Sequence, residues 1–163
     1  MADLKPWDAS QTGEVELGRG ANGTVRLYRN TTTNTPVAVK VFTLPPNDLQ
    51  RLGTMYSIRE EAKYLSRFGS EEFFPSYLGC LDIGSDQAAI AMEFVGDQVT
   101  GETTTIRKLL ERDQPHLRKE EVLEITLDIL TGFYMLHNNS TLINDFKDDN
   151  VLIYQEKMER ENH

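Results

Sequence analysis

The chain has 163 residues, with 26 acidic against 17 basic residues and a net charge of −9 at pH 7. This length suits one domain, or two very small lobes. An acidic field repels phosphate backbones and anionic lipid, so charge argues against nucleic acid and membrane surfaces as partners. Cys80 is the only cysteine, which excludes an intrachain disulfide and favours a reducing, cytoplasmic location. We expect no secretory signal and no membrane span, since no sufficiently long apolar run occurs.

Polar and apolar residues alternate in the first part of the chain, which is typical of strands. The first two alternating segments flank a glycine-rich turn over residues 18–23 and predict an antiparallel hairpin. Since most connections are hairpins, we expect an antiparallel five-stranded sheet. The predicted strands are 14–17, 24–28, 37–42, 77–82 and 88–95.

Helical patterns occupy the rest. One helix is predicted after the third strand, capped by Asn47 or Asp48 and ending at Gly69. Past Gly96 the pattern predicts a short helix over 103–112 and a long helix over 118–137. The long helix is apolar on two faces, one with Val122, Ile125, Ile129, Phe133 and Leu136 and the other with Leu123, Leu127 and Leu130. The predicted class is therefore α+β.

The glycine turn contains G-x-G-x-x-G, formed by Gly18, Gly20 and Gly23. Such a loop lets backbone amides approach phosphates, but an ordinary tight turn explains it equally well. In a dinucleotide-binding oxidoreductase the loop would open a helix, whereas here a strand follows. That reading is therefore disfavoured.

Lys40 follows in the next strand, in the sequence Val-Ala-Val-Lys. A lysine buried in an apolar strand needs an anionic partner, which the following helix offers in Glu60 and Glu61. The glycine loop and V-A-x-K together resemble the eukaryotic-type protein kinase family. The family's E-x-x-x-L helix pattern, matched by Glu61 and Leu65, selects Glu61 as the partner and leaves Glu60 as the alternative.

Residues 91–96 resemble the hinge of that family. The resemblance implies that Met92 is the gatekeeper, that the backbone of Glu93 and Val95 meets the adenine edge, and that Val25 and Ala38 cover the ring. A buried strand end would explain this segment alone equally well.

Residues 136–153 resemble the catalytic loop of the family, H-R-D-x-K-x-x-N. The resemblance implies that Asp145 orients and deprotonates a hydroxyl, Lys147 neutralises the transferring phosphoryl group and Asn150 ligates Mg²⁺. The family's His and Arg are replaced by Ile143 and Asn144, which argues against control by activation-loop phosphorylation.

The family places its Mg²⁺-binding D-F-G motif farther on, and the residues after Asn150 contain none. We therefore expect strongly reduced or absent transfer unless a late acidic residue substitutes, namely Glu156, Glu159 or Glu161. The expected organisation is a tail over 1–11, a kinase-like N-lobe over 12–95 and a hinge with a partial C-lobe over 96–163. The sequence does not say whether residue 163 is a natural end.

The leading interpretation is a Ser/Thr-type protein-kinase-like protein that uses ATP and Mg²⁺ and acts on a protein substrate. The alternative is a pseudokinase or decoy module that binds nucleotide or a regulatory protein without catalysis. An aminoglycoside or choline kinase-like protein fits less well, because the glycine loop and V-A-x-K favour a protein kinase. The second face of the 118–137 helix would lie uncovered, and we expect it to dimerise, bind a partner or have shrunk into a minimal lobe.

Overall fold

The computed structural model describes residues 4–6, 15–20, 23–69, 71–111, 117–143 and 145–154. The chain divides into two compact units, Met1–Phe94 with Gln98–Gly101 and Val95–Asp97 with Glu102–His163. Four residues discussed above lie outside the described part of the chain, namely Asn144, Glu156, Glu159 and Glu161. Positions 14, 21, 22 and 112 of the predicted segments also lie outside it.

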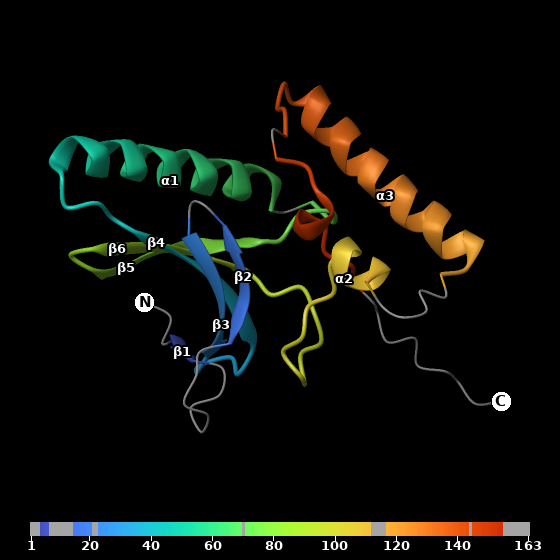
Figure 1. Ribbon diagram of the computed structural model, residues 1–163, viewed down its shortest axis with the longest axis horizontal. Coiled ribbons are helices and arrows are strands. Elements are labelled where there is room, and N and C mark those ends of the chain that lie inside the picture. The colour runs from blue at the N-terminus through green and yellow to red at the C-terminus, as the bar shows by residue number, and fades with distance from the viewer. Residues whose placement is uncertain are drawn as a thin grey trace. The chain divides into compact units, whose positions relative to one another are not determined.

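The first unit contains the antiparallel sheet that the alternating segments predicted (Figure 1). Its order is β1-β3-β4-β6-β5, and β2 also pairs with β3. The strands in the described residues are β1 Leu4–Pro6, β2 Glu16–Gly20, β3 Gly23–Asn30, β4 Pro36–Thr43, β5 Tyr77–Gly84 and β6 Gln87–Glu93. The five expected strands are confirmed, although β2 continues to Gly20, into the predicted turn, and β6 ends two residues before the predicted Val95.

The additional strand, β1, lies within the segment expected to be a tail. It pairs Leu4 with Asn30 and Pro6 with Tyr28. The other strand on this edge, β2, pairs only with residues 23–26 of β3. The end of β3 would therefore expose an unpaired edge, and β1 covers it.

Alternation along β4 divides the apolar core between the two faces of the sheet. On one face Val37, Val39 and Val41 pack with Ala89 and Ala91. The opposite face carries Phe42, which packs with Leu44, Ile58, Ala62 and Ile90 in the cluster beneath the following helix. Lys40 belongs to this second face, because it lies two residues from Phe42.

The helix α1, Asp48–Phe68, lies along that face of the sheet (Figure 1). Of the two predicted caps, Asn47 is the one used, and its side chain accepts hydrogen bonds from the amides of Leu49 and Gln50. Gly69 ends the helix as predicted, and its N–H donates to the carbonyl of Leu65. A Cβ at Gly69 would lie 2.6 Å from both Leu65 O and Tyr77 N, so the chain can turn here only without a side chain.

The second unit contains α2 Ile106–Leu110, α3 Lys119–Asn138 and the 3₁₀ turn η1 Asp148–Asn150. The long helix is confirmed almost at its predicted bounds. The short helix begins later than expected, because Thr105 caps it by accepting a hydrogen bond from the amide of Lys108. After η1, Leu152 forms a single antiparallel bridge with Thr105. In the described part of the chain, no helix is long and apolar enough to cross a membrane.

Candidate functional site

Lys40 lies in the middle of β4, and its ammonium group meets a carboxylate from α1. Nζ of Lys40 is 2.6 Å from Oε1 of Glu61, and the two side chains are 21% and 32% exposed. The ammonium also lies 5.1 Å from the centre of the Phe42 ring, a cation–π contact on the same sheet face. Oε2 of Glu60, the alternative partner, is instead 3.6 Å from Nζ of Lys63 on the surface of α1. An ammonium has three N–H donors, so one carboxylate leaves donors for an anionic ligand.

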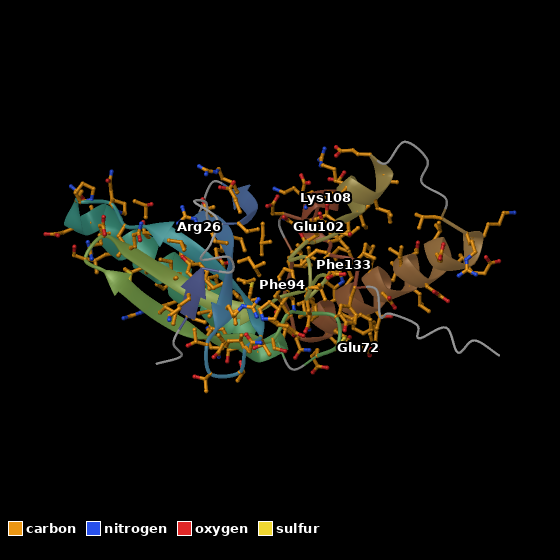
Figure 2. All side chains as sticks on the ribbon, turned by 90° about the horizontal axis from the view of Figure 1, so that it is seen from below. Arg26, Glu72, Phe94, Glu102, Lys108 and Phe133 are labelled. Atoms are coloured by element: carbon orange, nitrogen blue, oxygen red, sulfur yellow. The ribbon has the colours of Figure 1, made fainter. Side chains whose placement is uncertain are left out.

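The sheet register brings several predicted nucleotide-contacting residues to this face. Val25 lies opposite Lys40, and Ala38 lies opposite Met92. Opposed residues of antiparallel strands project to the same side. Val25, Ala38 and Met92 accordingly pack in one apolar cluster with Phe94, which Figure 2 labels. A cation beside an apolar surface suits a ligand that is apolar at one end and anionic at the other.

The three glycines of the predicted loop lie in the β2–β3 hairpin, with Gly18 opposite Val25 and Gly20 opposite Gly23. Gly23 has a φ of 151°, and a Cβ there would lie 2.5 Å from Val41 O, so only glycine fits. A Cβ at Gly18 or Gly20 would meet no protein atom within 4 Å. Packing therefore does not require glycine at these two positions, whereas close approach of a ligand to the backbone would.

The segment predicted to meet a base is divided between the two units. Glu93 ends β6, and its carboxylate accepts hydrogen bonds from the amide and hydroxyl of Ser76, at 3.0 and 2.7 Å. The N–H of Glu93 donates to Ser76 O at 2.8 Å. Of its two backbone groups, only the carbonyl could therefore meet a base. Val95 is the first residue of the second unit.

The second unit brings Asp145, Lys147 and Asn150 together. Nζ of Lys147 is 3.1 Å from Oδ2 of Asp145. The side-chain amide of Asn150 donates to the backbone carbonyl of Asp145 at 2.8 Å and to its Oδ2 at 3.2 Å. The turn η1 establishes this geometry, because the N–H of Asn150 donates to Lys147 O. The three residues form one polar cluster, with the Asp145 side chain 74% exposed.

These contacts affect the acidity of Asp145. The hydrogen bond from Lys147, followed by that from Asn150, lowers the pKa of the Asp145 carboxyl group. The group is therefore ionised at neutral pH and is a weak proton acceptor. It is better suited to orienting a hydroxyl group and stabilising positive charge than to removing a proton early.

An aromatic contact that sequence reasoning missed attaches this cluster to α3. The rings of Phe146 and Phe133 meet edge to face with centroids 4.8 Å apart, and Figure 2 labels Phe133 on α3. Phe146 lies between Asp145 and Lys147 in the sequence, so its packing restrains both neighbours. The available signal was an aromatic residue within an otherwise polar loop.

The oxygen donors in the second unit bear on whether a metal could bind. Among the described residues, no group of three or more His, Cys, Asp or Glu side chains is placed to hold a metal ion. Asp145 and Asn150 offer a carboxylate and an amide oxygen, which are ligands of the type that Mg²⁺ prefers. This donor set fits Mg²⁺ arriving with the phosphates of a nucleotide, rather than an ion held by protein alone.

Residues 12–160 match the protein kinase domain family. Because the match covers most of the chain, the chain belongs to the protein kinase family. The antiparallel sheet with its helix and the helical second unit are the α+β fold of that family. Protein kinases use ATP with Mg²⁺ and bind protein substrates.

Several protein kinases are similar to this chain over most of its length. It is 30% identical over 154 residues to mitogen-activated protein kinase kinase kinase ANP1 of Arabidopsis thaliana, covering 93% of this chain and 22% of that protein. It is 28% identical over 145 residues to inhibitor of nuclear factor kappa-B kinase subunit alpha of Danio rerio, covering 85% of this chain and 18% of that protein. It is 29% identical over 141 residues to the DNA damage response protein kinase DUN1 of Saccharomyces cerevisiae, covering 85% of this chain and 26% of that protein. The chain thus spans only a minor part of each relative.

Proposed function

We propose that this chain binds ATP with Mg²⁺ and transfers the γ-phosphoryl group slowly to serine or threonine hydroxyls of a protein. The observation that carries the proposal is the 2.6 Å pair between Lys40 and Glu61 on the same sheet face as the apolar cluster. The serine/threonine preference is supported by Lys147 two residues after Asp145 and by similar proteins named as serine/threonine-protein kinases. A cytoplasmic location is proposed because the exposed Cys80 is a free thiol.

In this proposal each residue has a distinct task. Lys40 binds the anionic phosphates, and the apolar cluster around Ala38 receives the base. Asp145 orients the acceptor hydroxyl, Lys147 neutralises charge on the transferred group, and Asn150 contributes an oxygen to Mg²⁺. When bound, Mg²⁺ would neutralise charge on the phosphate oxygens.

The proposed slowness follows from the sparse set of metal ligands. Asn150 is a neutral donor, and the described residues place no cluster of acidic side chains for a metal. Phosphoryl transfer depends on positioning and charge stabilisation rather than on covalent participation of the protein. A site short of one well-placed electrostatic element typically loses about 10²–10³ in rate.

Binding is tested by thermal unfolding with ATP, with and without Mg²⁺, on the wild type and on Lys40→Met. ATP at about 100 times its dissociation constant stabilises a protein by about 2.7 kcal/mol. We expect the wild type to show a shift that Mg²⁺ increases, and we expect Lys40→Met to lose it. A wild type that melts cooperatively without any shift would contradict nucleotide binding.

A non-catalytic interaction module is the second candidate, and one face of α3 favours it. Four large side chains on this face are between 59% and 68% exposed, namely Leu123, Leu127, Leu130 and Tyr134. Spacings of three and four residues place them on one stripe of the helix. Contiguous exposed apolar surface commonly marks a binding surface. The proposed occupant is a second copy of this chain.

Ultracentrifugation of the wild type and of Leu127→Glu tests this association. We expect the wild type to dimerise with increasing concentration, and we expect the variant to remain monomeric because dimerisation would bury a charge. Leu52→Glu, at an equally exposed leucine on α1, is the matched control and should dimerise normally. A wild type that is monomeric at high concentration would exclude this use of the α3 face.

A further inference from the structure

An arginine-centred contact lies next to the polar cluster of Asp145, Lys147 and Asn150. Arg107 lies in the first turn of α2, and its Nη2 is 2.9 Å from Oδ1 of Asp148. Its Nε is 2.8 Å from Oδ1 of Asp149. Both aspartates belong to η1, which ends at Asn150 and is drawn in red beside α2 in Figure 1. One guanidinium group therefore joins two consecutive carboxylates.

Backbone hydrogen bonds join the same two segments just beyond this contact. The N–H of Ile106 donates to Val151 O at 3.0 Å, and the N–H of Ile153 donates to Thr104 O at 2.8 Å. The chain around Asn150 is thus attached to the start of α2 through the Arg107 side chain before it and through the backbone after it. Because Asn150 in turn donates to Asp145, the position of η1 determines where the Asp145 carboxylate lies.

The local charge explains why an arginine is needed here. Between Asp145 and Asn150 the loop has three aspartates and one lysine, and Lys147 contacts Asp145. Asp148 and Asp149 would otherwise repel each other and Asp145. The two carboxylates raise the pKa of Arg107, Asp148 having the larger effect. A guanidinium group can bond two carboxylates through separate nitrogens in a fixed plane, whereas an ammonium group is a single point charge.

We propose that Arg107 is a positioning residue, which fixes η1 against α2 and thereby holds Asp145 and Asn150 in their mutual arrangement. The inference rests on the proposed function, because that function gives the loop its chemical task. The physical claim about the loop is separate, because the contacts exist whether or not phosphoryl transfer occurs. Exposed single ion pairs contribute little, but a pair of carboxylates on one planar fork constrains geometry as well as charge.

Amide hydrogen exchange of the whole chain tests the claim without requiring activity. In Arg107→Ala we expect the amides of Asn150 and Ile153 to exchange at least about tenfold faster, because local opening becomes easier. Arg107→Lys should restore part of the protection. Lys108→Ala is the matched control. The Lys108 ammonium donates to the backbone carbonyl and the hydroxyl of Thr103, at 3.0 and 3.3 Å, so its loss should leave both amides unchanged.

A second variant keeps the test decisive if Arg107→Ala unfolds the unit. Asp148→Asn/Asp149→Asn retains the arginine and should raise the exchange of the same two amides, with the β4 amide of Val39 unaffected. Unchanged exchange at Asn150 and Ile153 in either folded variant would overturn the proposal.

A kinetic measurement separates positioning from a merely structural contribution. With a protein substrate, Arg107→Ala should lower kcat by about tenfold with the KM for ATP unchanged, and Arg107→Lys should recover part of kcat. A change confined to KM would overturn the positioning role. If the wild type transfers no phosphoryl group while the exchange results hold, the proposed function fails and the contact between Arg107 and η1 stands.

Discussion

Replacing Asp145 with asparagine is expected to lower phosphoryl transfer by about 10²–10³-fold, the range for loss of one positioned electrostatic group. Asparagine has the same shape and retains a carbonyl oxygen, but it has no charge to orient the acceptor hydroxyl. The loop should stay in place, because Asn150 also donates to the backbone carbonyl of residue 145 at 2.8 Å. The affinity for ATP should therefore change little, and the loss should appear in kcat. The measurement is a radiolabel transfer assay with parallel nucleotide titration.

The matched control for this substitution is Asp128→Asn, which makes the same chemical change at an exposed position on α3. It should transfer phosphate at the wild-type rate. Equal activity in Asp145→Asn and the wild type would mean that any transfer does not depend on this loop. Vigorous Asp145-dependent transfer would instead contradict the expectation that the activity is slow.

The parts of the fold that could be predicted from sequence depend on short-range patterns. The apolar run over residues 37–42, which the prolines at 45 and 46 follow, identified β4. Asn47 and Gly69 identified the ends of α1, because caps and turns require particular residue types. The short strand β1 could not be predicted in the same way. Three residues carry no periodicity, and this strand forms because β2 leaves the end of β3 unpaired.

Contacts between distant residues limited the prediction of the site. The residue types at Lys40, Asp145 and Asn150 carried a recognisable spacing, so the candidates could be named. Arg107 and Asp148 are 41 residues apart, and nothing in the local pattern of α2 predicts their contact. The edge-to-face contact of Phe146 with Phe133 could not be predicted from the sequence either, because it depends on where the loop returns over α3. The contacts of side chains that act through tertiary neighbours could therefore be identified only from the structure.

Removing either partner of the Lys40–Glu61 pair is expected to destabilise the first unit more than removing both. In Lys40→Met the Glu61 carboxylate keeps its half-buried position without a counter-ion. In Glu61→Leu the Lys40 ammonium loses its counter-ion in the same way. The double variant Lys40→Met/Glu61→Leu leaves no unpaired charge. The two side chains are 21% and 32% exposed, which lies between surface and buried pairs, so we expect a coupling free energy of about 1–2 kcal/mol.

Denaturant unfolding of the four proteins in this cycle measures the coupling. The pair between Lys63 and Glu60 is the matched control, because both residues lie on α1, the helix that carries Glu61. Nζ of Lys63 is 3.6 Å from Oε2 of Glu60, and the lysine side chain is 70% exposed. Its cycle should give about 0.5 kcal/mol or less, and salt should weaken it further. The double variant should regain stability but not ATP binding, because the donors for phosphate are gone. If it bound ATP like the wild type, Lys40 would not contact the phosphates, and equal coupling in both cycles would mean that partial burial adds nothing to the Lys40–Glu61 pair.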